Sequence, residues 1–411
     1  MQLLLDAGAD LAFFRKDGDK SIANIFVRAY GNKPLLSSLI SAYPDFKIDG
    51  HDACNLLEKD LESGNMDILD FFARSSMLGR AFLTSCLPIA VKRRNETMLR
   101  RLLELGADVL AMHIEDGLFA TDLHVDMLRI LLQYIPSTET CIPLFGTRAL
   151  IDAIEANIHD NEVLNLFISC KAVDLKSTTK FGGSGDHMAS PLGVAIAKEA
   201  GAYSSSFPLT KRLLDAGCDV NGIVSITYYR QGAQRMPKTP LLKAIETKNK
   251  CLVQFVIDRG AQVNATATLG IRRTPLQAAA EQGNLDIVQL LLRNGAGVNA
   301  NPATFDGGTA LQCAAMGGNC NIAALLLDHF AGLSTPPSPF NGRWPIEAAA
   351  EHGRLDMIQF LWNVSCGNGF PSEQCLRAIE LAEENGHRAC ADLIRDLAVS
   401  NGIVLTLEGS E

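Results

Sequence analysis

Apolar and polar positions follow a helical period in one well-defined segment, residues 274–300. Its sequence is TPLQAAAEQGNLDIVQLLLRNGAGVNA, in which an alanine-rich stretch precedes the apolar stripe LDIVQLLL. Apolar residues three and four positions apart share one face of a helix. Thr274 is of a residue type that caps helices, and Gly283 and Gly295 are of the type that ends them. The pattern therefore predicts two short antiparallel helices followed by an extended finger.

The same pattern returns along the chain at a fixed interval. Positions equivalent to Thr274 fall at Thr239, Thr309 and Trp344, which places consecutive units 35 residues apart. The second-helix stripe GNLDIVQLL returns as GRLDMIQFL two units later. A helix pair of this size cannot bury its own apolar face, so copies must stack on one another. We therefore expect a solenoid of helix pairs.

Residues 274–300 resemble the ankyrin repeat, position for position, in both helices and in the finger. The likeness is specific over residues 239–365, good over 85–109 and 147–221, and based on periodicity elsewhere. It implies an all-α fold, an ankyrin-repeat solenoid of about ten to eleven helix-turn-helix units with hairpin fingers. The irregular array is similar to those of fungal ankyrin-repeat proteins.

The regularity of the units changes along the chain and divides it into four parts. Within the second part, the Gly- and Ser-rich residues 176–189 are expected to form a mobile loop. The alternating, β-branched residues 222–238 favour a short hairpin. The four parts are residues 1–175, degenerate repeats that start inside a repeat; 176–238, a repeat with inserted loops and a long finger; 239–371, regular repeats; and 372–411, a capping helix pair and tail.

Composition excludes some classes of partner. Hydrophobic residues make up 47% and aromatic residues 6% of the 411 positions, which suits a core of Leu, Ile, Val and Ala between thin helices. The net charge of −9 disfavours nucleic acid, whose phosphates need a basic surface. No apolar run reaches membrane-spanning length, and 11 cysteines without a CxxC pair indicate a reduced, intracellular protein. We expect a monomer of the cytoplasm or nucleus that binds another protein.

The sequence lacks the common motifs of catalysis and metal binding. Neither a phosphate-binding GxxxxGKS/T loop nor a zinc-binding HExxH helix occurs. The segment GGSGD approaches a nucleophile elbow, but Asp186 stands where the last glycine belongs. The 8 histidines share no ligand spacing. We therefore expect no enzyme, no cofactor and no metal site.

The likeness implies that function lies on a concave surface formed by the fingers and the exposed sides of the first helices. Tyr, Trp, Phe, Met and Arg are the side chains enriched at the centres of protein interfaces. Candidate positions occur in the long finger, just before the regular helix pairs, and along the ends of the first helices. The candidates are Tyr228, Tyr229, Arg230, Arg272, Arg273, Gln282, Phe305, Met316, Arg343, Trp344 and His352.

Other interpretations of these features remain open. The tyrosines could fold back on a neighbouring helix, and Arg272 with Arg273 could simply solubilise a finger tip. Trp344 gives up a helix cap worth about 1 kcal/mol, which favours a role in packing. The chain begins with the pattern of a repeat's end, MQLLLDAGADL. An alternative function is therefore the sensor or regulatory arm of a larger enzyme or NTPase whose catalytic domain lies upstream.

Two sets of amides bear on how neighbouring repeats hold together. Gln277 and Gln312 stand where the family usually has a histidine that ties neighbouring turns, and glutamine can serve the same purpose. Asn221, Asn264 and Asn299 occupy the family's finger asparagine, and we expect them to be structural turn residues.

Overall fold

The computed structural model divides the chain into two compact units, Met1–Asp174 and Leu175–Glu411. Two of the candidate residues, Tyr229 and Arg230, lie outside the residues that the structure describes. The described residues are 32–42, 67–74, 78–112, 125–135, 142, 145–156, 162–180, 187–201, 206–228, 235–267, 270–365 and 369–405.

The named elements of the first unit are helices. The second helix of one pair is capped by Asn95, whose side-chain oxygen accepts a hydrogen bond from the Met98 N–H at 3.0 Å. Ser85, the first residue of the range 85–109 that resembles a repeat, lies inside a helix that begins at Arg80 and includes the buried Phe82. The elements are α3 (Lys33–Ala42), α5 (Asp67–Arg74), α6 (Arg80–Lys92), α7 (Glu96–Glu104), η2 (Val109–Ala111), α8 (Val125–Gln133), α9 (Thr147–Glu155) and α10 (Glu162–Ser169).

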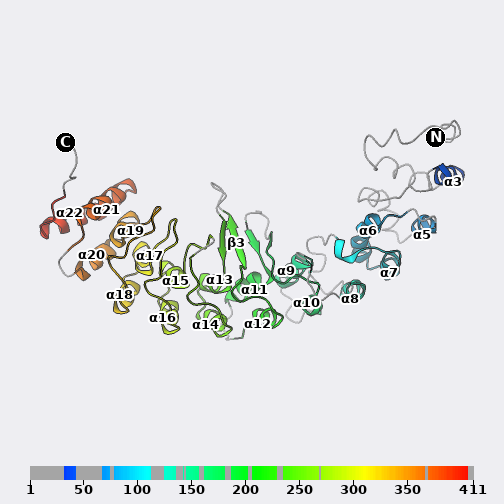
Figure 1. Cartoon of the computed structure of the whole chain (residues 1–411), viewed down its shortest axis with the longest axis horizontal. Helices are drawn as coiled ribbons and strands as arrows, with labels where there is room; N and C mark the ends of the chain where they lie inside the picture. The colour runs from blue at the N-terminus through cyan, green and yellow to red at the C-terminus, as the bar shows by residue number, and fades with distance from the viewer. Residues whose placement is uncertain are drawn as a thin grey trace. The chain divides into compact units, whose positions relative to one another are not determined.

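In the second unit the helices lie in two rows (Figure 1). The first row is α11 (Pro191–Lys198), α13 (Pro240–Glu246), α15 (Pro275–Glu281), α17 (Ala310–Gly317), α19 (Pro345–Glu351) and α21 (Ser372–Glu384). The second row is α12 (Pro208–Asp215), α14 (Lys250–Asp258), α16 (Leu285–Arg293), α18 (Cys320–Asp328), α20 (Leu355–Val364) and α22 (Arg388–Ser400), with the short η4 (Glu199–Gly201) after α11. Neighbours in the first row make closer contact than neighbours in the second, so the first row forms the concave side of this unit.

The ends of the first-row helices follow from capping chemistry. The Thr274 hydroxyl accepts from the Gln277 N–H, and Pro275 follows as the first helical residue, where no N–H is needed. Trp344 starts α19 without a side-chain bond to the helix, as its sequence suggests. The Glu347 carboxylate instead accepts from the Trp344 N–H at 3.0 Å, which closes the first turn from the other direction.

The core of the second unit lies between the two rows. Ala279, Ala314 and Ala349 occupy equivalent positions of successive first helices, and each is 0% exposed. Such small side chains let the helices approach closely. The second helices add larger apolar groups such as Leu291, which is also 0% exposed. Stacking thus buries the faces that a single pair would expose. The total of ten to eleven repeats stays a prediction.

One small sheet interrupts the helical pattern. Its antiparallel strands are β1 (Thr179–Lys180), β2 (His187–Ala189), β3 (Ser225–Tyr228) and β4 (Arg235–Lys238), in the order β1-β2-β3-β4. The hairpin expected within residues 222–238 is confirmed. The expectation of a mobile loop at 176–189 is wrong at its two ends, which form β1 and β2. These strands are too short to show a period in the sequence; residues 181–186 lie outside the described residues.

Figure 1 shows the sheet rising from the first-row side of the second unit, away from α12 and α14. The strands therefore stand where the fingers of the regular repeats also stand. Of the helices that the structure describes, none is long and apolar enough to cross a membrane. The same residues contain no group of His, Cys, Asp and Glu side chains that could hold a metal ion.

Candidate partner-binding surface

Asparagines in three successive fingers each connect one repeat to the next. The Asn264 side-chain oxygen accepts from the Gly297 N–H at 2.7 Å, and its amide donates to the Gly295 carbonyl at 2.9 Å. Asn221 and Asn299 make the same two kinds of bond to the repeat that follows each of them. These amides satisfy backbone groups at the ends of the second helices, so they fix the spacing of the fingers.

Buried glutamines connect the start of a first helix to the backbone of the finger that follows. The Gln277 oxygen accepts from the Thr274 N–H at 2.9 Å, while its amide donates to the carbonyl of Ala300 at 3.0 Å. Gln312 makes the equivalent bonds to Thr309 and Thr335, both at 2.9 Å. Both glutamines are almost fully buried. The amide therefore does what the sequence suggested it could do in place of the family's histidine.

A salt bridge fastens each of three fingers to the end of the first helix that follows. The Arg273 guanidinium bonds the Glu281 carboxylate twice, each time at 3.0 Å. Arg343 and Glu351 repeat this pair at 2.9 and 3.1 Å. The third pair joins Lys238 to Glu246 in the repeat before.

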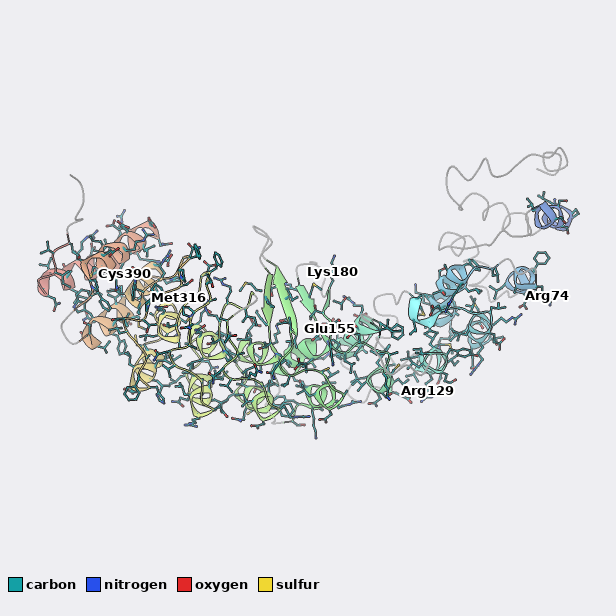
Figure 2. The ribbon with its side chains drawn as sticks, in the orientation of Figure 1. Arg74, Arg129, Glu155, Lys180, Met316 and Cys390 are labelled. Atoms are coloured by element: carbon teal, nitrogen blue, oxygen red, sulfur yellow. The ribbon has the colours of Figure 1, made fainter. Side chains whose placement is uncertain are left out.

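The repeat that begins at Thr309 lacks this salt bridge. Gly308 and Met316 stand at its two positions, so an uncharged gap separates the Arg273 pair from the Arg343 pair. Figure 2 labels Met316 at the end of α17, in the first row. A Cβ atom at residue 308 would lie 3.3 Å from the Cys313 sulfur, which leaves little room for a larger side chain there. Burial raises the pKa of the Cys313 thiol to about 12, so this sulfur is a neutral packing group.

Two phenylalanines stack on adjacent fingers. The ring centroids of Phe305 and Phe340 are 4.7 Å apart, with 13° between the ring planes. The two residues are 56% and 53% exposed. The fingers themselves are bonded, because the Asp306 N–H donates to the Phe340 carbonyl at 2.9 Å and the Phe340 N–H to the Thr304 carbonyl at 3.3 Å. The pair is therefore a preformed, exposed aromatic surface.

A pocket lies between β4, α13, α15 and the finger before α15. Its volume is about 280 Å³. Three candidates from the sequence, Arg272, Arg273 and Gln282, line it together. The Nε atom of Arg272 and the Oε1 atom of Gln282 are buried and have no hydrogen-bond partner. A second Arg272 nitrogen, Nη2, lies 3.3 Å from the Asp306 carboxylate.

The structure corrects the role expected for Arg273. It is only 9% exposed, and its nitrogens donate to Glu281 and to the backbone carbonyls of Arg272 and Asp306. Burial acts to lower the pKa of Arg273, but the neighbouring Cys313, Glu281 and Asp306 side chains together raise it above its ordinary value. This side chain is occupied within its own chain, so we remove it from the surface expected to contact a partner. The sequence suggested a partner contact or, alternatively, a solubilising finger tip, because the salt bridge to a residue eight positions later was not recognised.

The remaining candidates are spread along the first row. Met316, Arg343 and Trp344 are half-buried, whereas His352 is exposed, and its ring nitrogen Nδ1 lies 3.1 Å from the Ala348 carbonyl. Arg343 is held by its salt bridge, while Met316 lies in the uncharged gap.

Tyr228 lies in the long finger, and Phe340 lies in the finger before α19. Tyr228 ends β3, and the structure describes the backbone there but not the side chain. Phe340, which sequence reasoning missed, is the partner of the candidate Phe305. A signal was present: Phe-Asp-Gly at 305–307 returns as Phe-Asn-Gly at 340–342, one period later.

The comparisons with known proteins agree with the architecture. A family model described as ankyrin repeats (3 copies) matches residues 195–302 and residues 296–369. These ranges contain the regular repeats, the aromatic pair and the pocket. No curated protein matches the chain.

Proposed function

Since residues 195–369 belong to the ankyrin-repeat family, we propose that this chain is a non-enzymatic scaffold that holds a protein partner. Ankyrin repeats generally mediate contacts between proteins. The binding surface is formed by the fingers and the first helices of the second unit. The observation that carries the proposal is the exposed aromatic pair Phe305 and Phe340 on two bonded fingers.

Exposure of two neighbouring rings supports binding better than exposure of either alone. Single apolar side chains are common on protein surfaces, whereas contiguous apolar patches mark interaction sites. Aromatic side chains also contribute disproportionately to binding energy. Because the backbones of the two fingers are hydrogen-bonded to one another, a partner would lose little free energy in ordering them.

Paired charges lie next to the aromatic pair along the chain and supply polar groups beside it. Arg272 lies 3.3 Å from Asp306, beside Phe305, and Arg343 holds Glu351 in the next repeat. Protein interfaces commonly combine an apolar centre with a polar rim. The arrangement therefore favours a partner that covers the two rings with an apolar segment of its own.

Comparative affinity capture tests the proposal. The wild-type chain and the double variant Phe305→Ser/Phe340→Ser would be immobilised, and the proteins captured from the source cells identified by mass spectrometry. We expect proteins captured by the wild type to be lost with the double variant, while the melting curve stays the same. Phe330→Gly is the matched control, because Phe330 is 88% exposed but follows a second-row helix. Equal capture by all three proteins would exclude the aromatic pair as the binding site.

The long finger needs its own variant. Replacing Tyr228, Tyr229 and Arg230 together with alanine removes the aromatic and cationic groups that the sequence places there. Loss of capture with an unchanged melting curve would extend the binding surface to this finger. Undiminished capture would rule the finger out and leave the aromatic pair unaffected.

A further inference from the structure

Two residues that line the pocket beside α15 have, beneath its surface, one unsatisfied donor and one unsatisfied acceptor. The Nε–H group of Arg272 can donate one hydrogen bond, and the Oε1 atom of Gln282 can accept one. Both residues line the same pocket. A buried polar atom without a partner costs free energy, and a ligand that satisfied both atoms would recover it. The complementary ligand offers one acceptor and one donor.

Charge around the pocket is balanced within the chain. Arg273 is bonded to Glu281, Lys238 to Glu246, and Arg272 to Asp306. A carboxylate ligand would therefore meet the Gln282 oxygen and two glutamates without a free cation to offset its charge. An ammonium ligand would bring no acceptor for the Arg272 N–H. The balance favours a neutral group.

The size and walls of the pocket fit a side chain. A volume of about 280 Å³ lies just below the range for small-molecule sites, which runs from roughly 300 to 1,000 Å³. Met236, Pro237, Leu242, Ile271 and Ala278 contribute apolar surface to its lining. Apolar walls with a few placed polar groups are typical of specific pockets.

We propose that this pocket binds the carboxamide of a glutamine or asparagine side chain presented by the protein partner. The amide oxygen accepts from Arg272 Nε–H, and the amide NH₂ group donates to Gln282 Oε1. The apolar walls cover the methylene groups. This inference rests on the proposed function, because it names a group on the partner of the same surface. It also assigns a shared role to two side chains that each have one polar atom without a hydrogen-bond partner.

A series of small probes tests the chemistry without any protein partner. Methyl NMR spectra of the full chain would be recorded during titration with propanamide, propanoate, propylammonium or propan-1-ol. We expect propanamide to shift the methyl signals of Met236, Leu242 and Ile271, and to bind about tenfold more tightly than the other three probes. The methyl groups of Leu326, which is buried in α18, should not move.

Two variants identify the polar groups. Arg272→Lys keeps the charge opposite Asp306 but lacks the Nε–H, and Gln282→Leu keeps bulk but lacks the acceptor. Each should weaken propanamide binding about tenfold. Arg343→Lys and His352→Leu are matched controls in a later repeat and should bind propanamide as the wild type does. Melting curves establish that all four variants fold.

Three results would overturn the proposal. Equal shifts with all four probes would show an unselective apolar pocket, and tighter binding of propan-1-ol would assign it to a hydroxyl group. No saturable shift with any probe would mean that the pocket holds water only. None of these results bears on the scaffold function, which is tested by capture.

A peptide pair identifies the source of the amide. Acetyl-Ala-Gln-Ala-N-methylamide should bind more tightly than propanamide, while the peptide with methionine in place of glutamine should leave the pocket methyl signals unchanged. Binding of propanamide together with failure of the glutamine peptide would contradict a polypeptide ligand.

Discussion

The Arg273 guanidinium holds the Glu281 carboxylate through two parallel hydrogen bonds, Nε to Oε2 and Nη2 to Oε1, each 3.0 Å long. Arg273 lies in a finger, and Glu281 is the last residue of the helix that follows. The same guanidinium donates to the Asp306 carbonyl of the next finger at 2.7 Å. One buried side chain therefore fixes its own finger and joins two repeats.

Removal of that guanidinium should destabilise the array. We expect Arg273→Met to lower the free energy of unfolding by about 2 to 4 kcal/mol, because it leaves Glu281 and the Asp306 carbonyl without their donor. Arg343→Met should cost less, about 1 kcal/mol, since Arg343 is more exposed and its bonds to Gly342 and Glu351 stay within one repeat. Urea unfolding of both variants measures the difference. Equal losses would contradict a link between repeats through Arg273.

Glu347 should make stability depend on pH. It is 7% exposed, and burial raises its pKa above the ordinary 4.5 despite the bond from the Trp344 N–H. Arg343 and Arg377 act to lower the pKa, and Glu351 acts to raise it. The folded state therefore holds the proton more tightly than the unfolded state. The stabilisation from the protonated Glu347 carboxyl is complete below pH 4.5. It is lost as the pH rises through the raised pKa of Glu347 in the folded state.

The variant Glu347→Gln removes this dependence. Glutamine at the equivalent positions 277 and 312 makes the same cap while uncharged. We expect the variant to be about 1 kcal/mol more stable than the wild type at pH 7, with the gain shrinking towards pH 4.5. Denaturant titrations across this range measure it, with the exposed Glu373→Gln as the control. A gain that grew on acidification would have the wrong sign and refute the assignment.

Phe330 occupies a backbone position that suits glycine. Its φ is 65°, whereas the equivalent residues of the two preceding repeats are Gly260 and Gly295, at 94° and 80°. A left-handed conformation costs a residue with a Cβ atom about 1 to 2 kcal/mol. Phe330→Gly should therefore raise the midpoint of thermal unfolding, with a net gain of about 1 kcal/mol after the greater entropy of unfolded glycine.

Replacement of a glycine at the equivalent position of the preceding repeat serves as the control for Phe330→Gly. A Cβ atom at Gly295 would have nothing within 4 Å, so Gly295→Ala should destabilise through backbone strain alone. A stabilised alanine variant would show that this backbone position carries no such cost.

Leu291 tests whether damage stays local. It is 0% exposed in α16, and Leu291→Ala should cost about 2 to 5 kcal/mol through lost contacts and the cavity that remains. In a linear array each repeat contacts only its neighbours. Hydrogen exchange should therefore accelerate most in α14, α16 and α18. Uniform acceleration along the chain would contradict this expectation.

The sequence predicted the regular helices well because their signals are local and periodic. Thr274, the alanines after it and the leucine stripe each specify a cap, a thin helix or a buried face without reference to distant residues. β1 and β2 were missed because two or three residues carry no visible alternation. The burial of Arg273 was also missed, because the sequence around an arginine before a helix does not show whether its side chain is exposed or ion-paired.

Long-range pairing explains why the candidate surface was only partly predicted. Phe305 was chosen as a single aromatic residue, but its exposure matters through Phe340, which is 35 positions away. The pocket depends on β4, α13 and α15 meeting, which no local pattern specifies. Searching for recurrent residues at the repeat interval would have found the aromatic pair and the salt bridges, but not the cavity.

Each finger asparagine reaches only the repeat after it. A gene segment encoding one of the 35-residue repeats that carry this asparagine could thus be duplicated, and the new junction would present the same donors and acceptors; the repeat that begins at Thr309 has Ser334 instead. The array can therefore gain or lose whole repeats during evolution, while the surface side chains of each repeat change independently.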